Sequence, residues 1–132
     1  MKRWLILFIT LSLISCKKVA PDEDVFYSYE SMIFECFNNP ISPFATFTYE
    51  ITASQPGVYI FGATDGTCGS VTYIKTGKKT ARLIFDAYIY NTLIRDEYLL
   101  TFRTRKSGKY EYYRNSTFYE KGRFKFVERD KF

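Results

Sequence analysis

Residues 80–90 read TARLIFDAYIY and alternate between two kinds of side chain. One face carries apolar residues only (Ala81, Leu83, Phe85, Ala87 and Ile89), and the other carries mostly polar residues and tyrosines (Thr80, Arg82, Ile84, Asp86, Tyr88 and Tyr90). A period of two is that of a β-strand with one dry and one wet face. Because antiparallel sheets can leave one face in water, the stretch predicts an antiparallel sheet.

Six other segments after residue 44 read as short strands with similar patterning, and turn residues separate several of them. They cover residues 45–52, 58–61, 70–76, 97–103, 109–114 and 121–126. Pro56-Gly57, Gly77-Lys78 and Ser107-Gly108 are typical of turns. The fold class is therefore predicted to be all-β, a small antiparallel β-barrel or sandwich of about seven strands. We expect a single all-β domain over residues 25–132.

The segment Val25–Phe37 precedes these strands and has a different period. Its apolar side chains fall at helical spacing (Val25, Phe26, Tyr29, Met32, Ile33, Cys36 and Phe37). This spacing indicates a short helix lying across one end of a barrel.

The first residues have the layout of an export signal. Lys2-Arg3 is followed by an apolar run from Trp4 to Ile14, which is too short to span a bilayer as a mature helix. Residues 13–16, Leu-Ile-Ser-Cys, resemble the lipobox of bacterial lipoproteins, including those of the Bacteroidota type. The resemblance implies a signal peptide over residues 1–15, cleavage before Cys16 and acylation of Cys16. Residues 16–24 would then form a lipidated, flexible tether.

Acylation at Cys16 would hold the protein on a membrane of the cell envelope, with the outer membrane, periplasmic or surface-facing, as the expected place. The alternatives are a cleaved secretory signal or an uncleaved anchor helix, with Cys16 present by chance.

Two of the three cysteines, Cys36 and Cys68, follow the signal. In an oxidising compartment an isolated pair is most simply a disulfide, and two free buried thiols are the alternative. Metal binding is not expected, because the chain contains no histidine and the two cysteines are far apart in sequence.

Charge is unevenly divided along the chain. Residues 17–74 carry 2 basic and 7 acidic side chains, whereas residues 75–132 carry 15 basic and 7 acidic ones. The basic half favours an anionic partner, or it simply keeps the outer face of the sheet soluble. Nucleic acid is not an expected partner, because no recognition motif is present.

Residues 69–77, 80–83 and 98–102 resemble the up-and-down strands of small calycin or lipocalin-like barrels. The resemblance implies a barrel with a pocket for a hydrophobic ligand. The Gly-x-Trp of lipocalins is absent, because Trp4 is the chain's one tryptophan.

Catalysis is not expected, since the absence of histidine removes the usual nucleophile-activating bases, and no cofactor motif is present. The tyrosines are the functional signal. Tyr88, Tyr90, Tyr110 and Tyr112 are candidate ligand-binding residues, because tyrosine offers an apolar ring with a polar tip. Cross-strand ring pairing is the alternative.

The sequence predicts a cell-envelope lipoprotein with a small binding domain for a hydrophobic small molecule, a glycan or an envelope protein. The alternative is a structural or accessory envelope protein that acts through its outer sheet surface without a small ligand.

Overall fold

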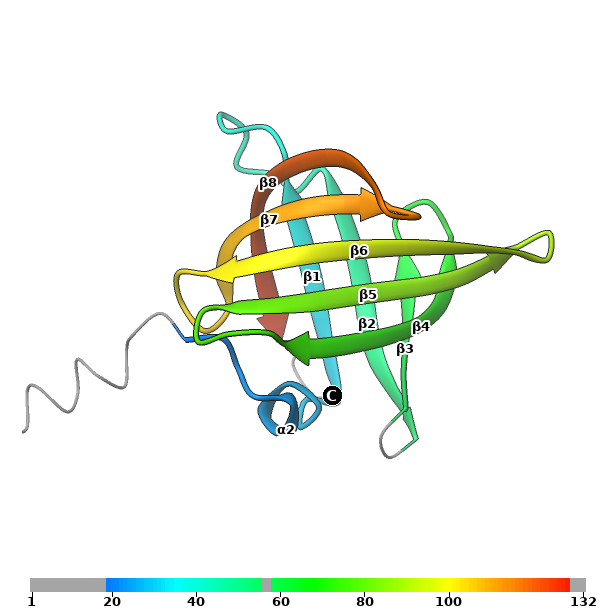
Figure 1. Cartoon of the computed structure of the whole chain (residues 1–132), viewed down its shortest axis with the longest axis horizontal. Coiled ribbons are helices and arrows are strands. Elements are labelled where there is room, and N and C mark those ends of the chain that lie inside the picture. The colour runs from blue at the N-terminus through cyan, green and yellow to red at the C-terminus, as the bar shows by residue number, and fades with distance from the viewer. Residues whose placement is uncertain (1–18, 56–57, 129–132) are drawn as a thin grey trace, which may run out of the picture.

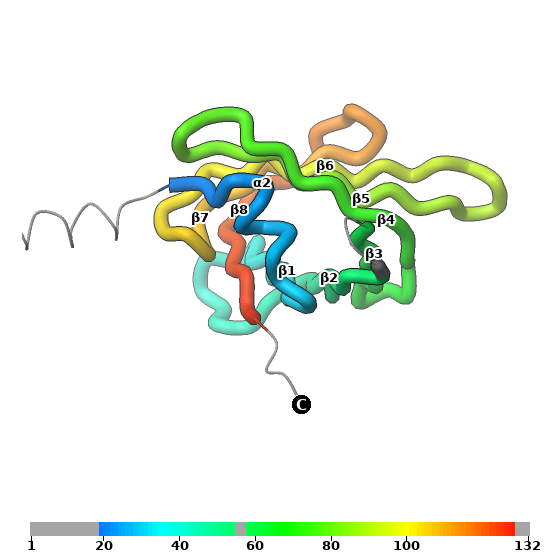
Figure 2. The backbone as a smooth tube through the Cα atoms, turned by 90° about the horizontal axis from the view of Figure 1, so that it is seen from below, coloured from blue at the N-terminus to red at the C-terminus, as the bar shows by residue number. Residues whose placement is uncertain are grey.

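The computed structural model describes residues 19–55 and 58–128, and these form a closed antiparallel barrel. The elements are α2 (Glu23–Phe26), β1 (Ser31–Phe37), β2 (Phe47–Gln55), β3 (Val58–Ala63), β4 (Cys68–Lys75), β5 (Thr80–Ile89), β6 (Thr92–Phe102), β7 (Ser107–Arg114) and β8 (Thr117–Glu128). Each strand pairs with the next, and β8 pairs with β1 to close the ring (Figures 1 and 2). The predicted antiparallel barrel is confirmed. The expected signal peptide, Cys16 and the expected Pro56-Gly57 turn lie outside the described residues.

The seven strands expected from the sequence correspond to β2 through β8, and β1 is an eighth. Met32, Phe34 and Cys36 of β1 are buried, and the residues between them are only partly so. β1 pairs over six positions with β2 and over six with β8. This strand therefore satisfies two edges that would otherwise be unpaired.

A short helix is present at this end of the domain, but it reaches only the first two residues of Val25–Phe37. The helix α2 spans only four residues, and the chain is extended from Ser31 onward. Met32 and Cys36 are both buried and lie four residues apart, a spacing that fits a helix and a strand equally well, so local spacing alone could not distinguish the two conformations. Pairing with two neighbouring strands decides the conformation of 31–37, because tertiary contacts override weak local preference.

Aromatic rings fill the barrel. Phe34 of β1 lies in the middle and contacts five rings, with centroids 5.0–6.0 Å away (Tyr49, Phe85, Tyr98, Phe124 and Phe126). Phe85 stacks on Tyr49 with 3.9 Å between ring centroids. Stacked and edge-to-face pairs of this kind stabilise a core beyond the burial of their area. The interior is therefore packed with protein side chains.

The two ends of the barrel differ. One end is covered by α2 and by the first described residues, and the other, which we call the open end, is bordered by the β3–β4 and β7–β8 turns. The β5–β6 hairpin extends beyond its neighbours on the side away from the chain start (Figure 1). Tyr90 and Asn91 at its tip both have positive φ, as do Asn115 and Ser116 in the β7–β8 turn. Two consecutive positive φ values are those of the type I′ turns that suit twisted hairpins.

The start of the described chain is packed against the barrel. Ala20 is 1% exposed, and its N–H donates to the carbonyl oxygen of Lys78 at 2.9 Å. The hydroxyl of Tyr73 donates to the carbonyl of Pro21 at 2.7 Å. Asp22 forms a 2.9 Å ion pair with Lys75. The part of the expected tether that the structure describes is therefore docked rather than free.

Cys36 and Cys68 are both free thiols, so the predicted disulfide is wrong. Cys36 lies on β1 and is buried, whereas Cys68 lies at the start of β4 and is exposed. Three strand spacings separate β1 from β4, roughly 14 Å around the wall, while a disulfide needs Cα atoms within about 7 Å.

Within residues 19–55 and 58–128, no helix has the length and apolar character needed to cross a bilayer.

Candidate functional site at the open end of the barrel

The open end holds a hollow of about 300 Å³ between the ends of several strands. We call it the open-end hollow. Its lining combines aromatic rings with polar side chains (Cys36, Asn38, Thr46, Phe47, Tyr49, Asp65, Tyr98, Tyr112, Arg114, Tyr119 and Glu120). Concave sites with a few convergent polar groups among rings are where small ligands usually bind.

One wall of the hollow is fixed by a buried carboxylate. Asp96 of β6 is 7% exposed and pairs in register with Arg114 of β7. The guanidinium donates to both carboxylate oxygens, with Nε to Oδ1 at 2.9 Å and the second bond at 3.2 Å. The hydroxyl of Tyr112 donates to Oδ1 at 2.7 Å. A bidentate pair with a third donor satisfies the buried charge and holds the ring of Tyr112 in place.

The floor is formed by tyrosines whose hydroxyls meet inside the barrel. The hydroxyls of Tyr49 and Tyr98 lie 2.7 Å apart. The ring of Tyr98 stacks on that of Tyr112 with centroids 4.7 Å apart. Burial raises the pKa of all three phenols well above the usual value. They are therefore neutral at physiological pH and act as hydrogen-bonding groups, not as bases.

Cys36 also lines the hollow, but its environment suppresses thiol chemistry. Burial raises the pKa of the Cys36 thiol, and a hydrogen bond with Tyr98 only partly offsets this. Because the thiolate is the nucleophile, a thiol held protonated in this way is inert.

A β-bulge brings a further ring to the rim. Tyr112 pairs with Glu120 and Tyr113 pairs with Phe118, so Tyr119 is the extra residue on β8. The ring of Tyr119 lies 5.7 Å from that of Tyr112, and the guanidinium of Arg114 lies 6.0 Å from its centroid. Tyr119 is nevertheless 62% exposed. Bulges commonly re-aim a side chain near a functional site, and this one leaves a ring available above the hollow.

Acidic groups outnumber basic ones around the hollow. Asp65 and Glu120 line it, against the single guanidinium of Arg114, whose charge Asp96 already neutralises. The backbone N–H of Thr67 donates to Asp65 and lowers the pKa of that carboxyl, so it is ionised at neutral pH. An anionic ligand would meet repulsion here, which favours a neutral, hydroxyl-bearing one.

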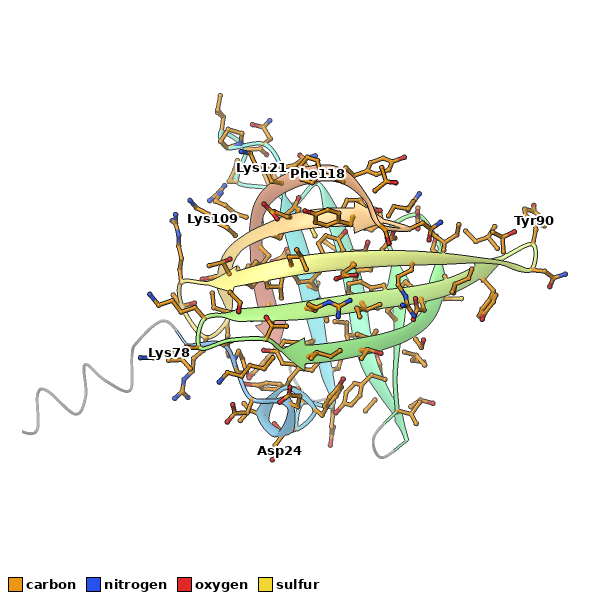
Figure 3. All side chains as sticks on the ribbon, in the orientation of Figure 1. Asp24, Lys78, Tyr90, Lys109, Phe118 and Lys121 are labelled. Atoms are coloured by element: carbon orange, nitrogen blue, oxygen red, sulfur yellow. The ribbon has the colours of Figure 1, made fainter. Side chains whose placement is uncertain are left out.

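The four tyrosines proposed from sequence do not form one site. Tyr112 lines the open-end hollow, whereas Tyr110 points into the barrel and donates to Glu120 at 2.7 Å. Tyr88 and Tyr90 lie at the tip of the β5–β6 hairpin, where Tyr90 is 97% exposed (Figure 3).

The sequence did not single out Tyr49, Tyr98, Tyr119, Asp96 and Arg114 as site residues. Tyr49 and Tyr98 were recognisable as inward positions, but the meeting of their hydroxyls depends on how the barrel closes. Asp96 was missed because the predicted strand began one residue after it.

Other hollows lie outside the barrel. An outer trough of about 780 Å³ crosses β5 to β8 and is bordered by Arg82, Lys109, Glu111, Lys121 and Arg123, among others. Arg82 is already paired with Glu97, at 2.6 Å.

The second of these hollows, about 280 Å³, lies between the start of the described chain and the β6–β7 loop. Its lining includes Ala20, Phe26, Met32, Arg105 and Phe126.

No group of three or more side chains suited to a metal ion occurs among the described residues. Comparison with protein-family models, with curated proteins and with solved structures gave no match.

Proposed function

We propose that the protein is a lipid-anchored component of the cell envelope whose barrel binds a neutral sugar of a glycan at the open-end hollow. The observation that carries the proposal is the combination of tyrosine rings with an orienting Asp96–Arg114 pair in one hollow. Sugar rings present apolar C–H faces to aromatic rings and hydroxyls to polar side chains, and this lining offers both kinds of contact.

The filled interior argues against a lipocalin-like ligand within the barrel. A hydrophobic molecule would have to displace rings that already contact one another at 3.9–6.0 Å. Separating rings in a close-packed core costs the free energy of the contacts that are lost. A ligand at the open end leaves the core intact.

The test for the sugar site is a titration of the isotope-labelled chain with neutral oligosaccharides, followed by NMR chemical shifts. We expect the largest shifts at Tyr112, Arg114 and Tyr119. Tyr119→Ala should abolish binding without unfolding the protein, because Tyr119 is largely exposed. Tyr88→Ala is the matched control, since Tyr88 is also exposed but lies on the distant hairpin. Binding that survives Tyr119→Ala, or that occurs only with cationic amines, would contradict the sugar assignment.

The anchor is tested separately. Metabolic labelling with palmitate and mass analysis of the mature chain should show acylated Cys16 at the N-terminus. Cys16→Ser should move the protein out of the membrane fraction. An unlabelled chain that still carries residues 1–15 would refute the anchor.

The filled core also supports a second candidate, a structural or accessory envelope protein with no small ligand. Native mass spectrometry of the barrel isolated from cell extract separates the two, because a bound sugar mass supports the first and empty spectra support the second.

A further inference from the structure

Five basic side chains lie in two neighbouring loops beside the start of the described chain. Lys78 and Lys79 come from the β4–β5 loop, and Arg103, Arg105 and Lys106 come from the β6–β7 loop. All five are exposed. We call them the basic loops.

Backbone hydrogen bonds join these loops to each other and to the chain start. The N–H of Phe102 donates to the carbonyl of Lys79 at 2.7 Å. The N–H of Ala20 donates to the carbonyl of Lys78. Arg105 and Lys106 border the same hollow as Val19 and Ala20. The positions of the five cations relative to Ala20 are therefore set by the fold and not by a loose linker.

Nearby carboxylates leave most of this charge unneutralised. Lys106 pairs with Glu128 at 3.1 Å, and Asp22 pairs with Lys75 instead of with a loop residue. Asp24 of α2 projects from the underside of the barrel, while Lys78 points to the side from which the described chain starts (Figure 3). Within the described residues, the other four cations of the basic loops form no ion pair.

The distance to the expected anchor is short. Three residues lie between Cys16 and the docked Ala20, and even a fully extended chain spans these four residue steps in about 14 Å. Two of those residues are Lys17 and Lys18. A lipid on Cys16 would therefore bring the basic loops to within about one or two Debye lengths, each about 8 Å, of the headgroups.

We propose that the basic loops contact anionic lipid headgroups and hold the barrel in one orientation on the membrane. The inference rests on the proposed anchor for its place in the cell, but the contact itself needs no anchor. A polybasic cluster adjacent to a lipid is the kind of surface that anionic bilayers attract. The β5–β6 hairpin, on the opposite side of the barrel, then points away from the membrane (Figure 1).

The test uses residues 19–132 without the anchor, because all eight strands pair within residues 31–128. Co-sedimentation is measured with vesicles of phosphatidylcholine, with or without about one third phosphatidylglycerol. We expect binding to the anionic vesicles only. Lys78→Gln/Lys79→Gln should weaken it roughly 30-fold, since each basic residue near the surface contributes about fivefold.

The control is Arg95→Gln, which removes a positive charge from the part of β6 next to the β5–β6 hairpin, away from the basic loops. It should change binding by no more than about twofold, because charges farther than a Debye length from the surface are screened. An equal loss per charge removed in the loop variant and in Arg95→Gln, or binding to pure phosphatidylcholine, would overturn the proposal. So would binding to an anionic polysaccharide but not to vesicles. A failure here leaves the Cys16 labelling result unaffected, so the two proposals fail separately.

Discussion

Replacing Phe85 by alanine tests whether the barrel interior is solid. Phe85 is 1% exposed, stacks on Tyr49 and contacts Phe34, Phe61 and Tyr98 edge-on or at an offset. A buried Phe→Ala change costs about 3–5 kcal/mol, from lost transfer free energy and from the cavity left behind. We take about 4 kcal/mol here, because the surrounding rings belong to four different strands and cannot all collapse inward.

The assay is equilibrium unfolding in urea. With a slope of about 2 kcal/mol per molar, a loss of about 4 kcal/mol lowers the midpoint by about 2 M. Phe85→Leu should cost only about 1 kcal/mol, and it keeps the test open if Phe85→Ala does not fold. Tyr88→Ala, on the exposed side of the same strand, should stay within about 0.5 kcal/mol of the parent.

Benzene gives a second readout. It should stabilise Phe85→Ala but not the parent, because an apolar cavity stays dry and binds apolar molecules. If the alanine variant shifts the midpoint by less than about 0.5 M, the interior is loosely packed. A loosely packed interior could admit a ligand, and the filled barrel would then no longer favour a ligand site at the open end.

The remaining predictions concern ionisation and thiol reactivity. Burial raises the pKa of five tyrosines (Tyr49, Tyr73, Tyr98, Tyr110 and Tyr112) above that of an unfolded tyrosine. Their contribution to stability is therefore full below about pH 10 and falls as pH rises further, by about 1.4 kcal/mol per pH unit for each group, because only the unfolded chain releases those protons. Phenolate absorbance for these five should appear together with loss of circular dichroism; gradual ionisation in the folded state would contradict their burial. A thiol reagent should modify Cys68 in the native protein and Cys36 only after denaturation; one unreactive disulfide-linked pair would instead restore the pairing first expected from sequence.

Alternation along the strands was enough to predict β2 through β8, because each buries one face. The same rule assigns Tyr88 and Tyr90 to the outer face and Tyr110 and Tyr112 to the inner one. Grouping these four as one site overlooked that assignment. The side of the sheet on which a residue lies can be predicted from the alternation along its own strand. The residues that it contacts across the barrel cannot be predicted in this way.

Closure of the barrel accounts for most of what the sequence did not predict. Residues 31–37 form a strand because they pair with β2 on one side and with β8 on the other. The sequence of this segment does not by itself indicate either pairing. A disulfide between Cys36 and Cys68 was predicted because they are the two cysteines that follow the expected signal. The strand order places β2 and β3 between them. The open-end hollow depends on the Asp96–Arg114 register and on the bulge at Tyr119, both of which are set by pairing between strands.

The closed ring has a consequence for a protein crowded onto a surface. Each of the eight described strands has a hydrogen-bonded neighbour on both sides. Over the paired part of the ring, adjacent copies confined to two dimensions therefore find no exposed backbone template for sheet-to-sheet polymerisation, the usual hazard of concentrating β-proteins. The exception among the described residues is the end of the β5–β6 hairpin, where residues 87–89 and 92–94 lie beyond the pairing with β4 and β7. With the proposed anchor at Cys16, this architecture would allow dense coverage of a membrane by molecules that stay individually folded.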